Sequence, residues 1–200
     1  MILTVTLTLA VDVTYGVDRI RTGETTRVST VEHRAGGKGV NVARVLHALG
    51  QEVACAALRG VTRERAVAAL HPAGIRDETV TVAGESRLTV MVVDGDGAAT
   101  GFSEAGPTVS AGEWGRLRTR LRGLVPHAEA LVLSGSVPPG TPPDGYGQLV
   151  AAAVQQGIPA LLDAGGNALL AGSFDDAVYR RLRGQIHAFS LSIEPDCGDA

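Results

Sequence analysis

The stretch Arg34-Ala35-Gly36-Gly37-Lys38-Gly39-Val40-Asn41-Val42-Ala43 decides the fold, because three glycines and a lysine lead here directly into a helix. Beyond it, apolar residues recur at the spacing of a helix with one buried face, at Val42, Val45, Leu46 and Leu49. Gly50 then follows as a stop signal. The pattern predicts a glycine-rich loop that enters a helix over residues 40–49.

This loop is suited to an anionic or polyhydroxylated ligand. Glycines adopt positive φ angles and bring their backbone N–H groups close to a ligand, since no Cβ stands in the way. A helix N-terminus adds unpaired N–H groups and the positive end of the helix dipole. Lys38 supplies a mobile cation, and Asn41 supplies an amide that both donates and accepts hydrogen bonds. The alternative interpretation is a glycine-rich turn with a solvated lysine, which is common in α/β proteins.

Two familiar phosphate-binding motifs do not fit the loop. A Walker A loop has Ser or Thr directly after Gly-Lys to hold magnesium, whereas Lys38 is followed by Gly39. A dinucleotide-binding loop reads G-x-G-x-x-G, and the run that starts at Gly37 has Val42 at its last position. An unrelated Rossmann-type binder is therefore disfavoured.

The composition indicates a globular chain with room for one well-packed domain. The 200 residues are 44% hydrophobic and 20% charged, with a formal net charge of -3. This charge gives no general attraction to nucleic acid or to an anionic membrane, and no apolar run is long enough to span a bilayer. The two cysteines, Cys55 and Cys197, are too few for a disulfide framework and are interpreted as plain thiols. We therefore expect a cytoplasmic protein that binds neither nucleic acid nor membranes.

Strands and helices alternate along most of the chain. The predicted strands span residues 2–9, 52–58, 130–134 and 159–163. Helices are predicted from Thr62 to Leu70 and from Thr141 to Gly157, and Ser110-Ala111-Gly112-Glu113 has the capping-box spacing that opens a third, ending before Pro126. This alternation predicts a mostly parallel sheet with helices on both sides. Ligands of such sheets bind beyond the carboxyl ends of the strands, which points at residues 134–140 and at Asp163 with the glycines after it.

Two extended segments interrupt the alternation of strands and helices, and the last part of the chain shows no such alternation. Residues 11–34 are extended with polar residues on both sides, and Arg87–Val93 with Ala98–Phe102 predicts a hairpin turned at residues 94–97. Both are expected to form exposed sheet. From Ser173 onward the periodicity disappears, so the last strand identified is the one that ends at Asp163, and its sheet edge is expected to be uncovered.

Five landmarks occur in a fixed order along residues 1–172. They are Thr6-Leu7-Thr8-Leu9-Ala10-Val11-Asp12, Gly36-Gly37-Lys38-Gly39-Val40-Asn41-Val42-Ala43, Gly84-Glu85-Ser86-Arg87, Glu104-Ala105-Gly106-Pro107 and Ser134-Gly135-Ser136-Val137-Pro138-Pro139-Gly140. Together they resemble the ribokinase-like, or PfkB, carbohydrate kinases, and within them the 1-phosphofructokinase and tagatose-6-phosphate kinase branch. Thr8-Leu9 departs from the Asn-Pro of that family.

The resemblance implies a ribokinase-like, three-layer α/β/α fold with a mostly parallel sheet. A small β lid would come from the segments near 11–34 and 87–102, and residues 173–200 would be a divergent tail. It also implies phosphoryl transfer from ATP, with Mg2+, to a ketohexose phosphate, either fructose 1-phosphate or tagatose 6-phosphate, giving the bisphosphate. The lid forms a dimer in some relatives, which makes a homodimer through the lid the candidate assembly.

The resemblance also assigns contacts with the sugar phosphate. The residues that correspond to holders of sugar hydroxyls are Asp12, Gly36, Gly37 and Asn41. Those that lie where the family binds the existing phosphate are Arg27, Lys38, Arg87 and Ser136. A carboxylate accepts two hydroxyl hydrogen bonds, and arginine offers a planar fork to phosphate oxygens. Taken singly, each has a simpler interpretation: Asp12 can cap a turn, Arg27 can be a solvated charge, and Asp163 can support the site from behind or only form a turn.

The family's catalytic residues are not found in this chain. Its Gly-Ala-Gly-Asp loop, which forms an anion hole and carries the base, has no counterpart, and Cys197-Gly198-Asp199-Ala200 is interpreted as an accidental likeness. No catalytic and no metal-binding residue is assigned. We expect a kinase chain that is incomplete at its C-terminus and inactive alone, with binding of ATP and Mg2+ in doubt. The alternative is a non-catalytic protein that binds or senses a sugar phosphate.

Overall fold

The computed structural model describes residues 1–61, 74–165 and 186–188. Its main sheet has the strand order β11-β10-β9-β1-β4-β5, with β6 also paired to β4, and each pair is parallel. The strands are β1 (Ile2–Thr6), β4 (Val53–Gly60), β5 (Arg76–Asp77), β6 (Val80–Val82), β9 (Ala130–Ser134), β10 (Ala160–Asp163) and β11 (Ile186–Ala188). The predicted mostly parallel sheet is confirmed.

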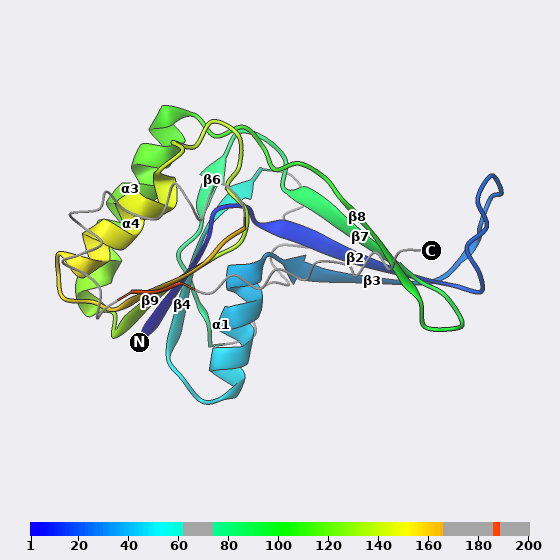
Figure 1. Cartoon of the computed structure of the whole chain (residues 1–200), viewed down its shortest axis with the longest axis horizontal. Helices are drawn as coiled ribbons and strands as arrows, with labels where there is room; N and C mark the ends of the chain where they lie inside the picture. Colours follow the sequence, from blue (N-terminus) through cyan, green and yellow to red (C-terminus); the bar gives the residue numbers. More distant parts are fainter. Residues whose placement is uncertain (62–73, 166–185, 189–200) are drawn as a thin grey trace, which may run out of the picture.

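Helices lie on both sides of this sheet (Figure 1). α3 (Ala111–Leu124) and α4 (Gly145–Val154) lie on one side, and α1 (Lys38–Ala48) lies on the other. β4 shows why both sides are covered, since alternate residues of a strand face opposite ways. Leu58 joins the core under α3 and α4, whereas Cys55 joins the core under α1. Among the described residues, no helix is long and apolar enough to cross a bilayer.

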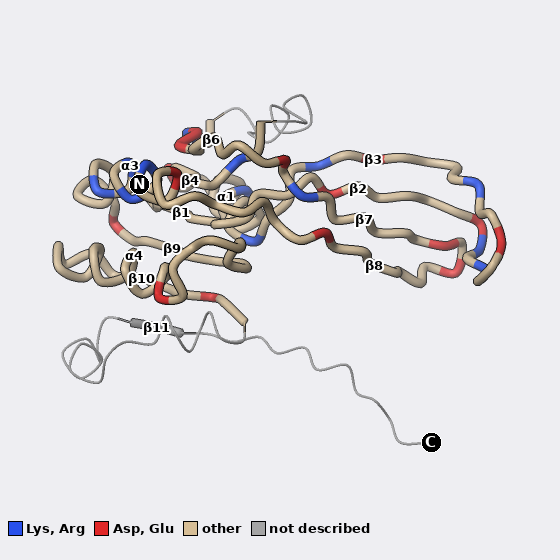
Figure 2. Tube along the Cα trace, turned by 90° about the horizontal axis from the view of Figure 1, so that it is seen from above, with Lys and Arg blue, Asp and Glu red and all other residues tan. Residues whose placement is uncertain are grey.

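A second sheet, of four strands, extends away from the main sheet and its helices (Figure 2). Its order is β3-β2-β7-β8, formed by β2 (Ala10–Val17), β3 (Val28–Gly36), β7 (Arg87–Val93) and β8 (Ala99–Ser103). β2 and β7 are parallel, and the two outer pairs are antiparallel. This sheet, called the lid below, confirms the exposed sheet predicted from residues 11–34 and 87–102.

Local signals of the sequence produce the expected local structures. The Ser110 side chain accepts a hydrogen bond from the Glu113 N–H at 3.3 Å, and Glu113 Oε2 accepts one from the Ser110 N–H at 2.8 Å. This is the predicted capping box, and it opens α3. In the predicted hairpin turn, the Asp94 N–H donates to the Ala98 carbonyl and Gly97 has a φ of 83°. The capping box and the hairpin turn each depend on hydrogen bonds between residues no more than four positions apart, so the sequence alone could predict them.

The structure departs from the predictions at three points. α4 begins at Gly145 and not at Thr141, because a proline disfavours a helical conformation for the residue before it. Pro142 and Pro143 therefore form a turn, in which the Gly145 N–H donates to the Pro142 carbonyl at 2.8 Å. The prediction that the last strand ends at Asp163 is wrong, since β11 pairs with β10. The third departure is β5, a strand of two residues that the sequence did not predict. The helix expected from Thr62 to Leu70 lies outside the described residues.

The cysteine prediction is tested at one of the two positions. Cys55 is a free thiol buried on β4. Burial raises the pKa of this thiol to about 11, which keeps it protonated and unreactive near neutral pH. Cys197 lies outside the described residues.

Candidate functional site

The glycine-rich loop connects β3 to α1 beside the carboxyl end of β1. Gly37 precedes α1 with a φ of 112°, a conformation that residues with side chains rarely adopt. A Cβ on Gly39 would lie 2.7 Å from the Val5 carbonyl oxygen of β1. Gly37 therefore turns the chain, and Gly39 lets the start of the helix lie directly against the strand. The predicted helix is confirmed and starts two residues earlier, at Lys38.

Asp12 lies on β2 of the lid, next to this loop. It pairs in register with Arg34 on β3 and with Thr89 on β7. A Cβ on Gly36 would lie 2.0 Å from Asp12 Oδ1, so the carboxylate occupies the space that the glycine leaves. Burial raises the pKa of Asp12, while a hydrogen bond from Thr89 and the charge of Arg87 act in the opposite direction. The result is a half-buried acceptor with cations beside it.

Arg87 is the cation on the same side of the lid. It begins β7 opposite Ala10, and residues two apart on a strand point the same way, so Arg87 and Thr89 share a face with Asp12. The Nε of Arg87 is buried and has no hydrogen-bond partner among the described residues. Leaving such a donor unpaired costs about 1–3 kcal/mol. An oxygen of an anionic ligand would satisfy it.

A second cluster lies at the carboxyl ends of β9 and β10. Ser134 Oγ donates a hydrogen bond to Asp163 Oδ2 at 2.8 Å, and Lys38 Nζ lies 3.4 Å from the same oxygen. The Gly135 N–H donates to the Asp163 carbonyl, and the buried Tyr146 hydroxyl donates to the Gly135 carbonyl at 3.1 Å. Burial raises the pKa of Tyr146, so its hydroxyl stays protonated as the donor. These bonds fix the loop that follows β9.

The glycine-rich loop joins the two clusters. Gly36 lies against Asp12, and Lys38 pairs with Asp163. The connection from β1 to β2 is joined to the loop after β9 by a hydrogen bond, which Thr8 Oγ1 donates to the Ser136 carbonyl at 3.1 Å. Thr6 Oγ1, at the end of β1, is buried without a hydrogen-bond partner in the described part of the chain. We call this group the loop site, formed by residues Thr6, Thr8, Asp12, Gly36, Gly37, Lys38, Arg87, Ser134, Gly135, Ser136 and Asp163.

The loop site holds most of the residues that the sequence predicted, and two lie differently. Asn41 is exposed on the first turn of α1, where its Oδ1 accepts a hydrogen bond from Arg44 at 3.4 Å. Arg27 is exposed just before β3, whose first residue, Val28, pairs with Val17. Val17 is at the opposite end of β2 from Ala10, and seven residues of strand span about 23 Å. Within one chain, Arg27 is therefore not brought to Arg87.

Sequence reasoning missed Arg44 and Thr89, and it named Ser134 only as the first residue of the loop after its strand. Arg44 donates to the Ala35 carbonyl at 2.8 Å, and its charge lies close enough to act on the pKa of Asp12. It follows Asn41 by three residues, so helical periodicity would have found it. Thr89 follows Arg87 by two residues, so strand alternation would have found it. Ser134 is the last residue of β9, and only its pairing with Asp163 across the sheet shows its role.

The described residues do not complete a site for the magnesium ATP that the sequence resemblance implies. Among them, no group of three His, Cys, Asp or Glu side chains converges to hold a metal ion. Asp163 is a single carboxylate that already pairs with Ser134 and Lys38. No step that involves the nucleotide is therefore assigned to these residues.

Asp12→Asn is expected to raise the melting temperature at pH 7. The pKa of Asp12 is raised in the folded state above its ordinary value of about 3.9, so ionisation on going to higher pH lowers the stability of the fold. The advantage of the variant should therefore be largest at pH 7 and should shrink as the pH falls toward 4. Thermal melts between these pH values test it, with Asp96→Asn in the exposed hairpin as the control. A variant that melts below the wild type at pH 7 would contradict this account.

The family model described as pfkB family carbohydrate kinase matches residues 1–182 of the chain. A tagatose-6-phosphate kinase of Staphylococcus epidermidis is 34% identical over 170 residues, which are 84% of this chain and 54% of that protein. The matched range covers the loop site, including the lid strands that carry Asp12 and Arg87.

Solved structures show the same architecture. A possible 1-phosphofructokinase of Thermotoga maritima superimposes with a TM-score of 0.79 at 25% identity, over 85% of this chain and 55% of that one. Phosphofructokinase-2 of Escherichia coli, solved in complex with potassium, gives a TM-score of 0.76 at 30% identity, over 86% and 56%. The fold is therefore ribokinase-like, and the chain spans about half the length of the relatives it matches. The chain belongs to the pfkB family of carbohydrate kinases, enzymes that transfer phosphate to a sugar hydroxyl.

Proposed function

We propose that the loop site binds a ketohexose phosphate, fructose 1-phosphate or tagatose 6-phosphate, as the acceptor of an ATP-dependent kinase that forms the bisphosphate. The observation that carries the proposal is the buried, unpartnered Nε of Arg87 on the same lid face as Asp12. A sugar phosphate needs both groups, since arginine binds phosphate oxygens and a carboxylate accepts hydroxyl hydrogen bonds.

The remaining residues divide between the two ends of this ligand. The backbone of Gly36 and Gly37 lies beside Asp12 and would complete the contacts with sugar hydroxyls, with Asn41 at the edge. Ser136 is exposed on the loop after β9, and Lys38 is exposed enough to turn from Asp163 toward a phosphate. Arg27 is left out of this assignment because it lies at the far end of β2.

We assign only the acceptor half of a kinase site to the described residues. Because they hold no converging metal ligands, the 200-residue chain is expected to bind the sugar phosphate without turning over ATP. A coupled assay for ADP release tests this directly. Release of ADP that depends on the sugar phosphate would show that the chain is a complete kinase, whereas binding without release would support a sugar-phosphate-binding or regulatory role.

Fructose 1-phosphate or tagatose 6-phosphate is expected to raise the melting temperature of the chain. A ligand that binds only the folded state stabilises it by about 2.7 kcal/mol at a hundred times its dissociation constant. Fructose without a phosphate should give a much smaller rise, because it cannot use Arg87. A melting temperature that does not change with either sugar phosphate would contradict the proposal.

We also propose that the chain forms a homodimer through the apolar face of the lid. Val31 and Phe102 lie on the lid face opposite to Asp12, with 53% and 60% of their surface exposed. Large exposed apolar side chains that share one face are typical of interaction surfaces. Sedimentation should therefore detect a dimer, and Phe102→Glu should shift it toward the monomer. A wild-type chain that stays monomeric at high concentration would contradict this arrangement.

A further inference from the structure

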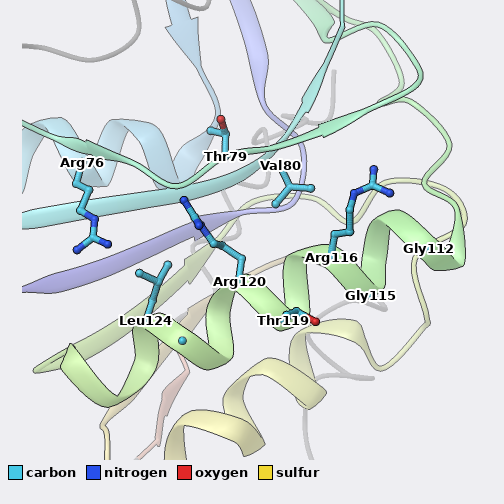
Figure 3. Close-up of a pocket in the computed structure, with 10 residues that line it drawn as sticks. Arg76, Thr79, Val80, Gly112, Gly115, Arg116, Thr119, Arg120 and Leu124 are labelled. Atoms are coloured by element: carbon cyan, nitrogen blue, oxygen red, sulfur yellow. The ribbon is translucent and has the colours of Figure 1, made fainter.

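A groove of about 890 Å3 lies between α3 and the β5–β6 segment (Figure 3). Arg76 and Thr79 line it from the sheet, and Arg116, Thr119 and Arg120 line it from α3. β5 lies at one edge of the main sheet, whereas β10, which carries Asp163, lies toward the other. The groove is therefore separate from the loop site.

We propose that this groove is a second binding site, for a small molecule that carries two adjacent phosphate groups. The ligand is either free diphosphate or a diphosphate ester of an organic group. This site is independent of the function proposed for the loop site, since the two share no residue.

Two of the arginines are held in place by one buried carboxylate. The side chain of Glu78 is only 2% exposed, and its two oxygens lie 2.5 Å from Arg76 Nε and 2.5 Å from Arg120 Nε. One negative charge thus faces two guanidinium groups, and the pair keeps a net positive charge. Both of these contacts use Nε, and the side chains of Arg76 and Arg120 are 61% and 55% exposed, which leaves their terminal nitrogens accessible to a ligand. These planar forks match phosphate oxygens and are already positioned, which lowers the entropy that binding costs.

A third arginine extends the positive charge along the helix. Arg116 precedes Arg120 by one turn, so both lie on the same side of α3. Arg116 donates to the Thr81 carbonyl at 3.0 Å and lies 3.9 Å from Glu113, whose carboxylate is already bonded to the Ser110 N–H. Figure 3 shows Arg120 reaching from α3 toward the strand side of the groove. Arg116 and Arg120 are about 6 Å apart along the helix axis, so a ligand with two linked phosphates can place one phosphate at the Glu78-bound pair and the other at Arg116.

Three of the α3 residues that line the groove are glycines that packing does not explain. Gly112, Gly115 and Gly123 line the groove, and a Cβ on any of them would meet no atom within 4 Å. Each costs the helix about 1 kcal/mol relative to alanine. Their effect is to keep the space beside the arginines open. The volume lies in the range of small-molecule sites, and Val80 and Leu124 add apolar surface for an organic group.

Calorimetric titration of the 200-residue chain with pyrophosphate at low ionic strength tests the proposal. We expect the groove to bind one pyrophosphate, with that binding weakened about tenfold by Arg116→Gln, which removes one charged donor and leaves Glu78 paired. Gly115→Glu should abolish binding, because it places a carboxylate among the arginines, while it favours the helix and keeps the chain folded. Arg122→Gln makes the same charge change on α3 outside the groove and should leave the affinity unchanged, as should Arg87→Ala in the loop site.

Three results would overturn the proposal. The first is no detectable binding of pyrophosphate at millimolar concentration. The second is equal weakening by Arg122→Gln and Arg116→Gln, which would mean diffuse attraction to an arginine-rich helix. The third is citrate binding as tightly as pyrophosphate, which would mean that the groove selects charge and not linked phosphates. Melting curves of the Gly115→Glu chain separate a lost site from a lost fold.

Discussion

Arg87→Ala should weaken the binding of fructose 1-phosphate or tagatose 6-phosphate by about a hundredfold, because it removes a charge-assisted pair of hydrogen bonds to the phosphate. It should change the stability of the unliganded chain only slightly. Truncation removes the buried, unpartnered Nε donor, and this gain offsets the loss of the attraction between Arg87 and Asp12. Affinity and stability are therefore expected to change independently at this position.

Titration calorimetry measures the affinity, and thermal melting without ligand measures the stability. Arg87→Lys keeps the charge and loses the planar fork, so its affinity should fall between those of the wild type and the alanine variant. Arg19→Ala, at an exposed residue beyond β2, is the matched control and should bind normally. Normal binding by Arg87→Ala would remove the central support for the loop site, and unfolding of that variant would show that Arg87 is structural.

The same substitution in two helices should change stability in opposite directions. Gly39→Ala would place a Cβ 2.7 Å from the Val5 carbonyl oxygen and 3.0 Å from Thr6 Cβ, where backbone must move to make room. We expect it to lower the free energy of unfolding by about 2 kcal/mol, as overpacking of a tight contact does. Gly115→Ala, in open space on α3, should raise that free energy by up to about 1 kcal/mol through helix propensity alone.

Urea unfolding of the two variants and the wild type measures both effects in one series. Gly39→Ala should also weaken sugar-phosphate binding, because it displaces the start of α1, which carries Lys38 and Asn41. Gly115→Ala should leave that binding unchanged. A rise in the free energy of unfolding of both variants would mean that helix propensity outweighs the contact between α1 and β1.

The placement of Asp12 and Arg87 connects the lid to binding. Both lie on the polar face of the lid, while Val31 and Phe102 lie on its opposite, exposed face. One thin sheet therefore carries the residues proposed for the ligand on one side and those proposed for the dimer on the other. A change in the packing of either face moves the same strands, β2 and β7.

Structures that depend on neighbouring residues were determined by the sequence alone. The glycine-rich loop with α1, the capping box of α3 and the β7–β8 hairpin each rest on hydrogen bonds or backbone conformations within a few residues, and each was predicted. The family landmarks likewise predict that Asp12, Lys38 and Ser136 belong to one binding region.

Tertiary structure decided what depends on distant residues. The burial that raises the pKa of Asp12 and leaves the Nε of Arg87 without a partner comes from segments far apart in the sequence, as in the pairing of β2 with β7 some 75 residues along the chain. Arg27 was separated from the loop site by the register of β2 with β3, and β11 was recognised only by its pairing with β10. Glu78 gave no signal in the sequence, since its role comes from burial between Arg76 and Arg120. The burial of a side chain and the register of two strands depend on elements far apart in the chain. Local sequence patterns and propensities therefore cannot predict them.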